Sequence, residues 1–267
     1  MGKGIQREVR FNRFYRMIGK MGLERLEGAR VTVVGIGAVG SFAVEALARS
    51  GVGELQLVDF DLVETSNINR QLIALESTLG RKKVEVARER VLDINPECRV
   101  ETLELKVERA ADTEPIFKGE PEVILDAIDI LEGKVTLIAE ALKRGFTLYS
   151  SMGAARRQDP TQVRAGKLGE VTGCPMARNL RRRFKELGIE EKVFGGLECV
   201  YSREKALSLL AEERAEPEIG HGMGDTGAKA PLPSSVAVTG VFGLCLGNLA
   251  IQKILQTRGV VEEMPGE

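Results

Sequence analysis

Residues 31–40 read Val31-Thr-Val-Val-Gly35-Ile-Gly37-Ala38-Val-Gly40, a short apolar run that ends in three closely spaced glycines. The apolar run predicts a buried strand. The glycines predict a tight turn in which backbone amides at the start of a helix can approach a phosphate closely. Asp59 ends the next apolar run, where a carboxylate can accept a hydrogen bond from a ribose hydroxyl. The pattern is typical of a Rossmann-type nucleotide-binding turn.

Apolar runs alternate with helix-like segments on both sides of this turn, from residue 29 to residue 151. Such alternation predicts an α/β fold with a Rossmann-like, doubly wound and mainly parallel sheet. The expected strands are 31–34, 55–58, 100–105, 123–127 and 147–150. The expected helices are 41–50, 82–94 and 131–144, each with apolar residues near the spacing of one helical face.

Beyond residue 153 the pattern predicts a smaller C-terminal extension that ends in an apolar helix, with strands at 161–167 and 198–202 and a strongly basic helix at 175–187. A mobile loop is expected at 212–232, because that segment is rich in glycine, proline and charge. We therefore expect four parts: a basic N-terminal arm (1–28, helical over 5–27), a nucleotide-binding domain (29–155), a region for substrate binding and dimerisation (156–256) and a tail (257–267).

Composition limits the classes of partner and metal site. Thirty-eight basic and 39 acidic residues nearly cancel, so any contact with nucleic acid must come from a local basic patch. The cysteines form no C-x2-C pair, which argues against zinc; they are Cys98, Cys174, Cys199 and Cys245. Their scatter and the lack of a signal peptide predict free thiols and a cytoplasmic location.

One uncharged stretch is long enough to span a bilayer, at residues 233–251. Its polar residues and the lack of a Trp or Tyr belt favour a buried or dimer-interface helix instead. Membrane association is therefore not expected, and only a peripheral contact is left open. The spacing Gly243-Leu-Cys-Leu-Gly247 would let two helix backbones approach closely, and we interpret it as part of a homodimer interface.

Four further motifs favour ATP over a nicotinamide, which the glycine turn and Asp59 alone would fit equally well. They are Asp59-Phe-Asp61, Ser66-Asn67-Ile-Asn69-Arg70-Gln71, Gly80-Arg-Lys82-Lys83 and Asp126-Ala-Ile-Asp129. Several cations, together with a carboxylate for a divalent metal, suit a triphosphate whose α-phosphorus is attacked, and hydride transfer needs neither. Lys82 fits a solvated helical turn, and Asp126 fits a structural carboxylate at a strand end.

In this order, the five motifs resemble the adenylation domain of the ThiF/MoeB/ubiquitin-activating superfamily. The resemblance implies that ATP and Mg²⁺ bind here, with Asp129 as the metal ligand. The implied nucleotide-binding residues are Gly35, Gly37, Ala38, Gly40, Asp59, Asp61, Ser66, Asn67, Asn69, Arg70, Lys83 and Asp129. Ala38 replaces a glycine that is usual in the superfamily, and its backbone amide should stay usable.

The superfamily resemblance also implies an arginine that reaches the site from the N-terminal arm of a second subunit. We favour Arg16 over Arg13 for this role. The expected catalytic set is then Arg16, Arg70, Lys83 and Asp129. A shared arginine of this kind predicts a homodimer.

The second half resembles the tRNA threonylcarbamoyladenosine dehydratase branch at residues 94–100, 159–162, 175–187 and 198–202 and in the apolar helix. This implies that ATP activates the carboxylate of N6-threonylcarbamoyladenosine at tRNA position 37 as an acyl-adenylate. The carbamoyl group of the same base then attacks, closing a ring with loss of water. The alternative is adenylylation of a ubiquitin-like sulfur carrier, a branch that usually carries paired zinc cysteines. A sulfur-metabolism protein is a further partner that the resemblance leaves open.

The basic helix at 175–187 carries the best candidate patch for tRNA phosphates: Arg178, Arg181, Arg182, Arg183 and Lys185. Arg156 and Arg157 could add to it near the mouth of the site. The alternative is a solvated helical face, which charge runs usually form. Cys199 could act as a catalytic or sulfur-relay thiol, but its apolar strand favours a buried structural thiol.

Overall fold

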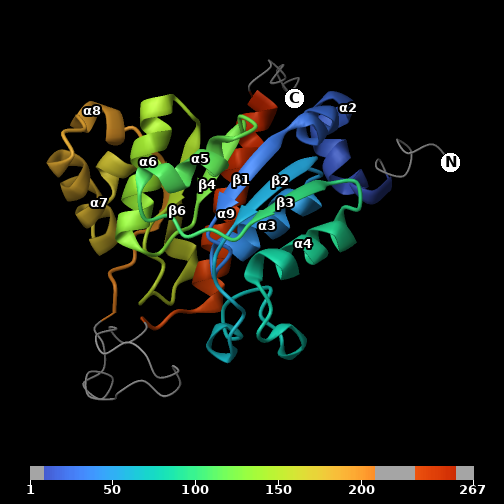
Figure 1. The fold of residues 1–267 in the computed structure, drawn as a ribbon, viewed down its shortest axis with the longest axis horizontal. Coiled ribbons are helices and arrows are strands. Elements are labelled where there is room, and N and C mark those ends of the chain that lie inside the picture. Colours follow the sequence, from blue (N-terminus) through green and yellow to red (C-terminus); the bar gives the residue numbers. More distant parts are fainter. Residues whose placement is uncertain (1–8, 208–231, 257–267) are drawn as a thin grey trace, which may run out of the picture.

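The computed structural model describes residues 9–207 and 232–256 and consists of a seven-stranded sheet with helices on both faces (Figure 1). The strand order is β3-β2-β1-β4-β5-β7-β6. The bounds are β1 Arg30–Val34, β2 Glu54–Val58, β3 Arg99–Leu103, β4 Val123–Asp126, β5 Leu148–Ser151, β6 Val163–Lys167 and β7 Glu198–Ser202. Among the strands of the described residues, only β6 runs antiparallel to its neighbour. The predicted doubly wound, mainly parallel α/β fold is confirmed.

Successive strand residues point to opposite faces of the sheet and so build two cores. Val31 and Val33 of β1 face one core, whereas Val34 faces the other. The first core contains residues of α3 (Gly40–Arg49), α4 (Lys83–Ile94) and α9 (Val236–Gln256). The second contains residues of α5 (Glu114–Phe117), α6 (Leu131–Arg144), α7 (Pro175–Glu186) and α8 (Glu191–Phe194).

The apolar helix α9 is a core helix of this fold. By length and hydropathy it could cross a membrane, yet 56% of its apolar window is buried inside the molecule. A Cβ atom on Gly243 would lie 2.2 Å from the carbonyl oxygen of Val39, and one on Gly247 would lie 2.9 Å from the Cβ of Ala46. The close approach is thus made to α3 of the same chain. This corrects our interpretation of the glycine spacing, and the homodimer itself stays a prediction.

The arm forms helix α2 (Asn12–Gly28), which breaks at Gly19 where φ is +67°. Phe11, just before it, is buried beside Gly51, and the Arg10 Nη1 donates to the carbonyl of Ile94 at 2.9 Å. Gly51 follows the C-terminal end of α3 and Ile94 is the last residue of α4, so α2 lies at the amino end of the parallel strands (Figure 1). The expected loop at 212–232, apart from Leu232, and the expected tail at 257–267 lie outside the described residues.

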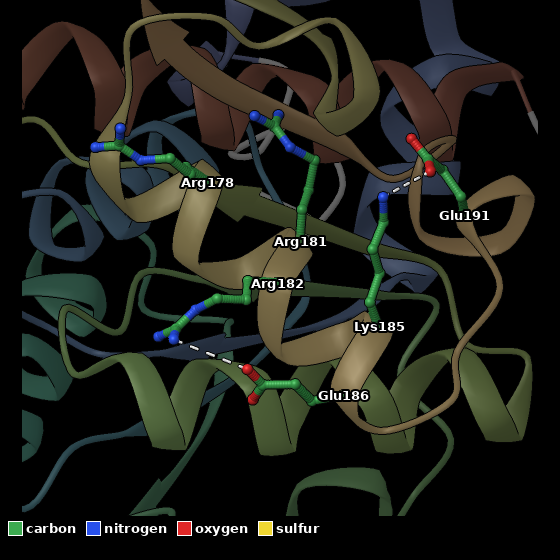
Figure 2. A pocket seen from close by; sticks show the side chains of 6 residues that line it. All are labelled: Arg178, Arg181, Arg182, Lys185, Glu186 and Glu191. Atoms are coloured by element: carbon green, nitrogen blue, oxygen red, sulfur yellow. Dashed lines mark ion pairs between the residues drawn. The ribbon is translucent and has the colours of Figure 1, made fainter.

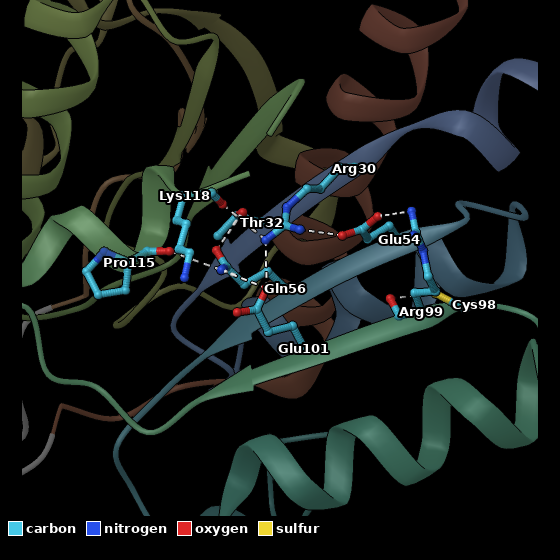
Figure 3. Close-up of polar contacts among 9 residues, drawn as sticks. All are labelled: Arg30, Thr32, Glu54, Gln56, Cys98, Arg99, Glu101, Pro115 and Lys118. Carbon is cyan, nitrogen blue, oxygen red and sulfur yellow. Dashed lines mark hydrogen bonds and ion pairs between the residues drawn. The ribbon is translucent and has the colours of Figure 1, made fainter. Parts of the chain in front are cut away.

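A polar ladder crosses β1, β2 and β3 on the face that α5 covers (Figure 3). The Thr32 hydroxyl donates to Gln56 Oε1 at 3.0 Å, and Gln56 Nε2 donates to Glu101 at 3.3 Å and to the carbonyl of Pro115 at 3.1 Å. Arg30 adds ion pairs to Glu54 and Glu101. Because a slip of one residue would turn these side chains to the other face, the ladder fixes the strand register that positions the site.

Candidate functional site

The glycine turn lies where the strand order reverses, because β1 is flanked by β2 on one side and β4 on the other. Ligands of open α/β sheets bind at such a point, outside the carboxyl ends of the strands. Gly35 has φ of +90°, and a Cβ there would lie 2.8 Å from the carbonyl oxygen of Ala127. Gly40 begins α3, and its Cβ would lie 1.7 Å from the Gly35 oxygen. The turn therefore requires glycine and presents the N-terminus of α3.

Asp59 is held in place by the backbone on both sides of the turn. Its Oδ2 accepts from the Ile36 amide at 2.6 Å, and its Oδ1 accepts from the Asp61 amide at 2.8 Å. Burial raises the pKa of this carboxyl above its usual value, while the charge of Lys83 and the two amides act in the opposite direction. Each carboxylate oxygen has a further lone pair, so Asp59 can still accept from a ribose hydroxyl.

Lys83 points into the molecule and Lys82 points out of it. The Lys83 Nζ lies 2.7 Å from Asp61 Oδ2; the lysine side chain is 6% exposed and the aspartate 45%. Lys82 precedes α4, is 51% exposed and pairs with Glu104 at the surface. The exposure of Lys82 agrees with the solvated position expected for it, and the phosphate role of Lys83 stays a prediction.

The loop after β2 folds back over the glycine turn. It contains the 3-10 turn η1 (Thr65–Asn67), and the Leu72 amide donates to the Ser41 hydroxyl of α3 at 3.2 Å. Asn67 accepts from the Glu64 amide at 3.1 Å, and Arg70 Nη1 donates to the carbonyl of Ser66 at 2.6 Å and to Asn69 Oδ1 at 3.0 Å. In this structure Asn67 and Arg70 cap their own loop, so reaching a phosphate requires Arg70 to exchange these contacts.

Gln71 is a residue to which the motif assigned no role, yet its side chain lies beside Gly37 of the turn. Its Nε2 would be 3.8 Å from a Cβ on Gly37, and its side chain is buried with Oε1 lacking a hydrogen-bond partner. A buried amide without a full set of partners beside a phosphate-binding turn indicates a ligand contact. In the sequence, the only sign of such a role for Gln71 is that it ends the motif at residues 66–71.

The carboxylates after β4 divide into one buried and one exposed group. Asp126 is fully buried and accepts from Lys134 Nζ and the Ser150 hydroxyl, each at 2.6 Å. This agrees with the structural role expected for Asp126. Asp129 is exposed in the loop that passes beside Gly35. Within residues 9–207 and 232–256, no group of three or more His, Cys, Asp or Glu could hold a metal by itself.

Arg16 is exposed on α2, at the amino end of the strands, whereas the glycine turn follows the carboxyl end of β1. The structure therefore brings Asp59, Asp61, Lys83 and the loops of Arg70 and Asp129 to one edge, and it leaves Arg16 away from the turn of its own chain.

The basic face of α7 lines a hollow of about 570 Å³ (Figure 2). Arg181 is fixed by the carbonyls of Leu168 and Val171, at 2.7 and 2.9 Å. Carboxylates neutralise part of the remaining charge: Lys185 pairs with Glu191 at 2.9 Å, Arg182 with Glu186 at 3.8 Å, and Arg183 with Glu132 at 2.9 Å and Glu186 at 2.6 Å. Arg178 has no side-chain hydrogen bond or ion pair within the described residues. The net positive charge of this patch is therefore smaller than that of its five basic side chains taken alone.

Cys199 is a buried thiol in β7. Its Sγ donates to the carbonyl of Gly166 at 3.4 Å. Burial raises the pKa of Cys199 to about 12, and the neighbouring Cys174 adds to this. A thiol that stays protonated at neutral pH is a poor nucleophile, which fits the structural role expected for it.

The sequence and the fold of this chain resemble those of known proteins of one family. The model of the ThiF family matches residues 11–264. The chain is 39% identical over 248 residues to the tRNA threonylcarbamoyladenosine dehydratase of Bacillus subtilis, covering 92% of this chain and 94% of that protein. The structure of the Escherichia coli tRNA N6-threonylcarbamoyladenosine dehydratase, TcdA, in complex with ATP matches with a TM-score of 0.81 at 32% identity, covering 93% of this chain and 94% of that one.

An adenylyltransferase is also similar to this chain. The molybdopterin-synthase adenylyltransferase of Salmonella typhimurium is 36% identical over 215 residues, covering 77% of this chain and 83% of that protein. The similarity to the Bacillus subtilis protein extends over more of the chain.

Proposed function

Because the chain belongs to the ThiF family, we propose that it is an ATP-dependent tRNA threonylcarbamoyladenosine dehydratase. One observation carries the proposal. The glycine turn, Asp59, the Lys83–Asp61 pair and the loop of Asp129 share one sheet edge, in a chain that covers 94% of a dehydratase of that name. ATP binds at this edge, and tRNA carrying the threonylcarbamoyl group is the substrate.

The first step transfers AMP to the carboxylate of the modified base. The phosphates lie over the turn between Gly35 and Gly40, where the amides at the start of α3 stabilise negative charge. Asp59 accepts from a ribose hydroxyl, and Lys83 supplies positive charge while Asp61 holds its ammonium group. A carboxylate oxygen attacks the α-phosphorus, the bond to pyrophosphate breaks, and an acyl-adenylate forms.

The second step needs no nucleophile from the protein. The carbamoyl group of the same base attacks the acyl carbon, AMP leaves with one carboxylate oxygen, and the ring closes with net loss of water. A nucleophile held in the same molecule gains the advantage of proximity. The protonated state of Cys199 is compatible with this route.

Asp129 would hold the Mg²⁺ ion that accompanies ATP. Mg²⁺ usually takes one or two carboxylates, completes its shell with phosphate oxygens and water, and so needs no preformed group of three protein ligands. Asp129 is exposed in its loop, and Asp61 is 45% exposed on the neighbouring one. When bound, the ion would neutralise part of the phosphate charge.

The position of Arg16 supports a homodimer. Because α2 lies at the far end of its own sheet, Arg16 can meet a triphosphate only in another subunit. The exposed arginines Arg178 and Arg182 are the members of the α7 patch that are best placed for RNA phosphates. A tRNA substrate implies a cytoplasmic location, and a sulfur-metabolism partner stays a prediction.

The test is to incubate the protein with ATP, Mg²⁺ and tRNA that carries the modification, followed by mass spectrometry of the digested nucleosides. We expect the modified nucleoside to lose the mass of one water, with AMP and pyrophosphate formed, and unmodified tRNA to give neither product. Pyrophosphate exchange that requires a small protein ending in Gly-Gly, without any change in the tRNA, would overturn the proposal.

A further inference from the structure

The loop that follows β5 contains a buried arginine, and two of its three guanidinium nitrogens are unpaired. Arg157 is 3% exposed. Its Nη1 donates to the carbonyl of Ala155 at 2.9 Å, but Nε and Nη2 are buried and have no hydrogen-bond partner within the described residues. Burying a charge without a partner is unfavourable, so an orphaned guanidinium in a native fold indicates a missing ligand.

The two unpaired nitrogens define the shape of that ligand. Nε–H and one N–H of Nη2 point in the same direction along one edge of the guanidinium plane. That edge matches the two oxygens of a carboxylate or phosphate and binds them through two parallel hydrogen bonds. The opposite side, at Nη1, is fixed by the backbone of Ala155. The unpaired edge of Arg157 therefore has the donor geometry that an oxyanion requires.

The backbone on both sides of Arg157 is clamped. Arg156 has φ of +63°, an uncommon conformation for a residue with a side chain. It is stabilised by hydrogen bonds to the carbonyls of Pro233 at 2.8 Å and Leu207 at 2.6 Å. On the other side, the Glu204 carboxylate accepts from the amides of Gln158 and Asp159, the latter at 2.9 Å. The backbone that carries Arg157 is thus fixed on both sides.

This loop lies at the same edge of the sheet as the glycine turn. β5 runs parallel to β4, and β4 runs parallel to β1, so their carboxyl ends point the same way. Two strand spacings separate β1 from β5, or about 10 Å. The loop after β5 therefore begins near the end of β1, where the glycine turn starts, with β4 and the loop of Asp129 between them.

We propose that the Nε and Nη2 edge of Arg157 binds the carboxylate of the substrate nucleoside before AMP transfer; this inference rests on the proposed function. Both carboxylate oxygens are held, and each keeps a lone pair that faces away from the guanidinium. One of them attacks the α-phosphorus while pyrophosphate leaves. The acid loses its negative charge in that step, so the contact with Arg157 weakens and the acyl group is free for attack by the carbamoyl group.

The experiment compares the affinities of wild type, Arg157→Gln, Arg157→Lys and the control Arg88→Gln for two tRNAs, one with the threonylcarbamoyl group and one with unmodified adenosine. Arg88 is a 47% exposed arginine on α4. We expect Arg157→Gln to weaken binding of the modified tRNA by about 10- to 100-fold and to leave the unmodified tRNA and ATP unchanged. Arg157→Lys keeps the positive charge but not the two parallel N–H donors, so it should show only part of the wild-type preference for the modified tRNA. Arg88→Gln should match wild type.

Each other outcome overturns the inference. Equal weakening of both tRNAs by Arg157→Gln would mean that Arg157 binds an RNA phosphate. An unchanged preference, with or without a lower Tm, would mean that the arginine is structural. Wild type that neither dehydrates the nucleoside nor prefers the modified tRNA would overturn the proposed function as well. Wild type that dehydrates it, with the preference intact in Arg157→Gln, would overturn this inference alone.

Discussion

At the scale of single residues, Lys82 and Lys83 are adjacent in sequence but have opposite surroundings. Lys83 is 6% exposed and held by Asp61, whereas Lys82 is 51% exposed and held by Glu104. We predict that Lys83→Ala lowers kcat/KM for adenylylation by about 100- to 1000-fold, because a fixed charge beside the reacting phosphate is lost. Lys82→Ala should lower it by less than about fivefold. Pyrophosphate release with modified tRNA measures both values, and similar losses for the two variants would contradict the role of Lys83.

Cys199 gives a prediction about pH. A thiolate forms as the pH rises toward the pKa, and with a pKa of about 12 only roughly one thiol in ten thousand is ionised near pH 8. We therefore expect iodoacetamide to leave Cys199 of the native protein unlabelled near pH 8 and to label it after unfolding in urea. Folded Cys199→Ala should keep its dehydratase turnover. Rapid labelling of the native thiol, or loss of turnover in the folded variant, would show that Cys199 takes part in the chemistry.

Part of the site could be predicted from the order of residues in the motifs. The place of Lys83 just after Gly80 made it a candidate ligand of the phosphates. The place of Asp126 at a strand end predicted a structural carboxylate, and the structure buries it against Lys134. Gln71 and Arg157 could not be recognised in this way. Whether a buried polar group has a partner depends on residues far away in the sequence, so their orphaned atoms appear only in three dimensions.

At the scale of elements, the contact between α9 and α3 depends on a glycine. We predict that Gly243→Ala lowers the free energy of unfolding by about 2–4 kcal/mol, because its Cβ would collide with the Val39 carbonyl at 2.2 Å. This loss exceeds the roughly 1 kcal/mol that alanine gains over glycine inside a helix. Leu244→Ala, at a side chain that is 47% exposed, should change the free energy of unfolding by less than about 1 kcal/mol. Urea unfolding measures both, and an unchanged midpoint for Gly243→Ala would refute the packing.

The positions of most elements could be predicted, whereas the partner of one could not. The helix expected at 41–50 is observed at Gly40–Arg49, because strands buried on both faces must alternate with the helices that cover them. The spacing of Gly243 and Gly247 predicted a close helix contact, but such spacing does not specify which helix approaches. The sheet brings α3 and α9 together on one face, and this pairing is a property of the whole fold.

At the scale of the whole molecule, the proposed homodimer places Arg16 of one subunit beside Lys83 of the other. We predict that Arg16→Ala and Lys83→Ala are each nearly inactive alone. After joint unfolding and refolding of equal amounts, half of the dimers are mixed, and one site in each contains both native residues. About a quarter of wild-type turnover should return. A refolded mixture that is no more active than either variant refolded alone would contradict a site shared between subunits.

The central claim is that ATP activates a carboxylate at the edge formed by the glycine turn, Asp59 and Lys83. The most direct measurement uses tRNA whose threonyl carboxylate carries a heavy oxygen isotope, followed by mass spectrometry of the AMP released in one turnover. The acyl-adenylate route predicts that every AMP carries one heavy oxygen, because the bond that breaks in the second step joins the acyl carbon to that oxygen. Unlabelled AMP, or formation of ADP in its place, would contradict the account.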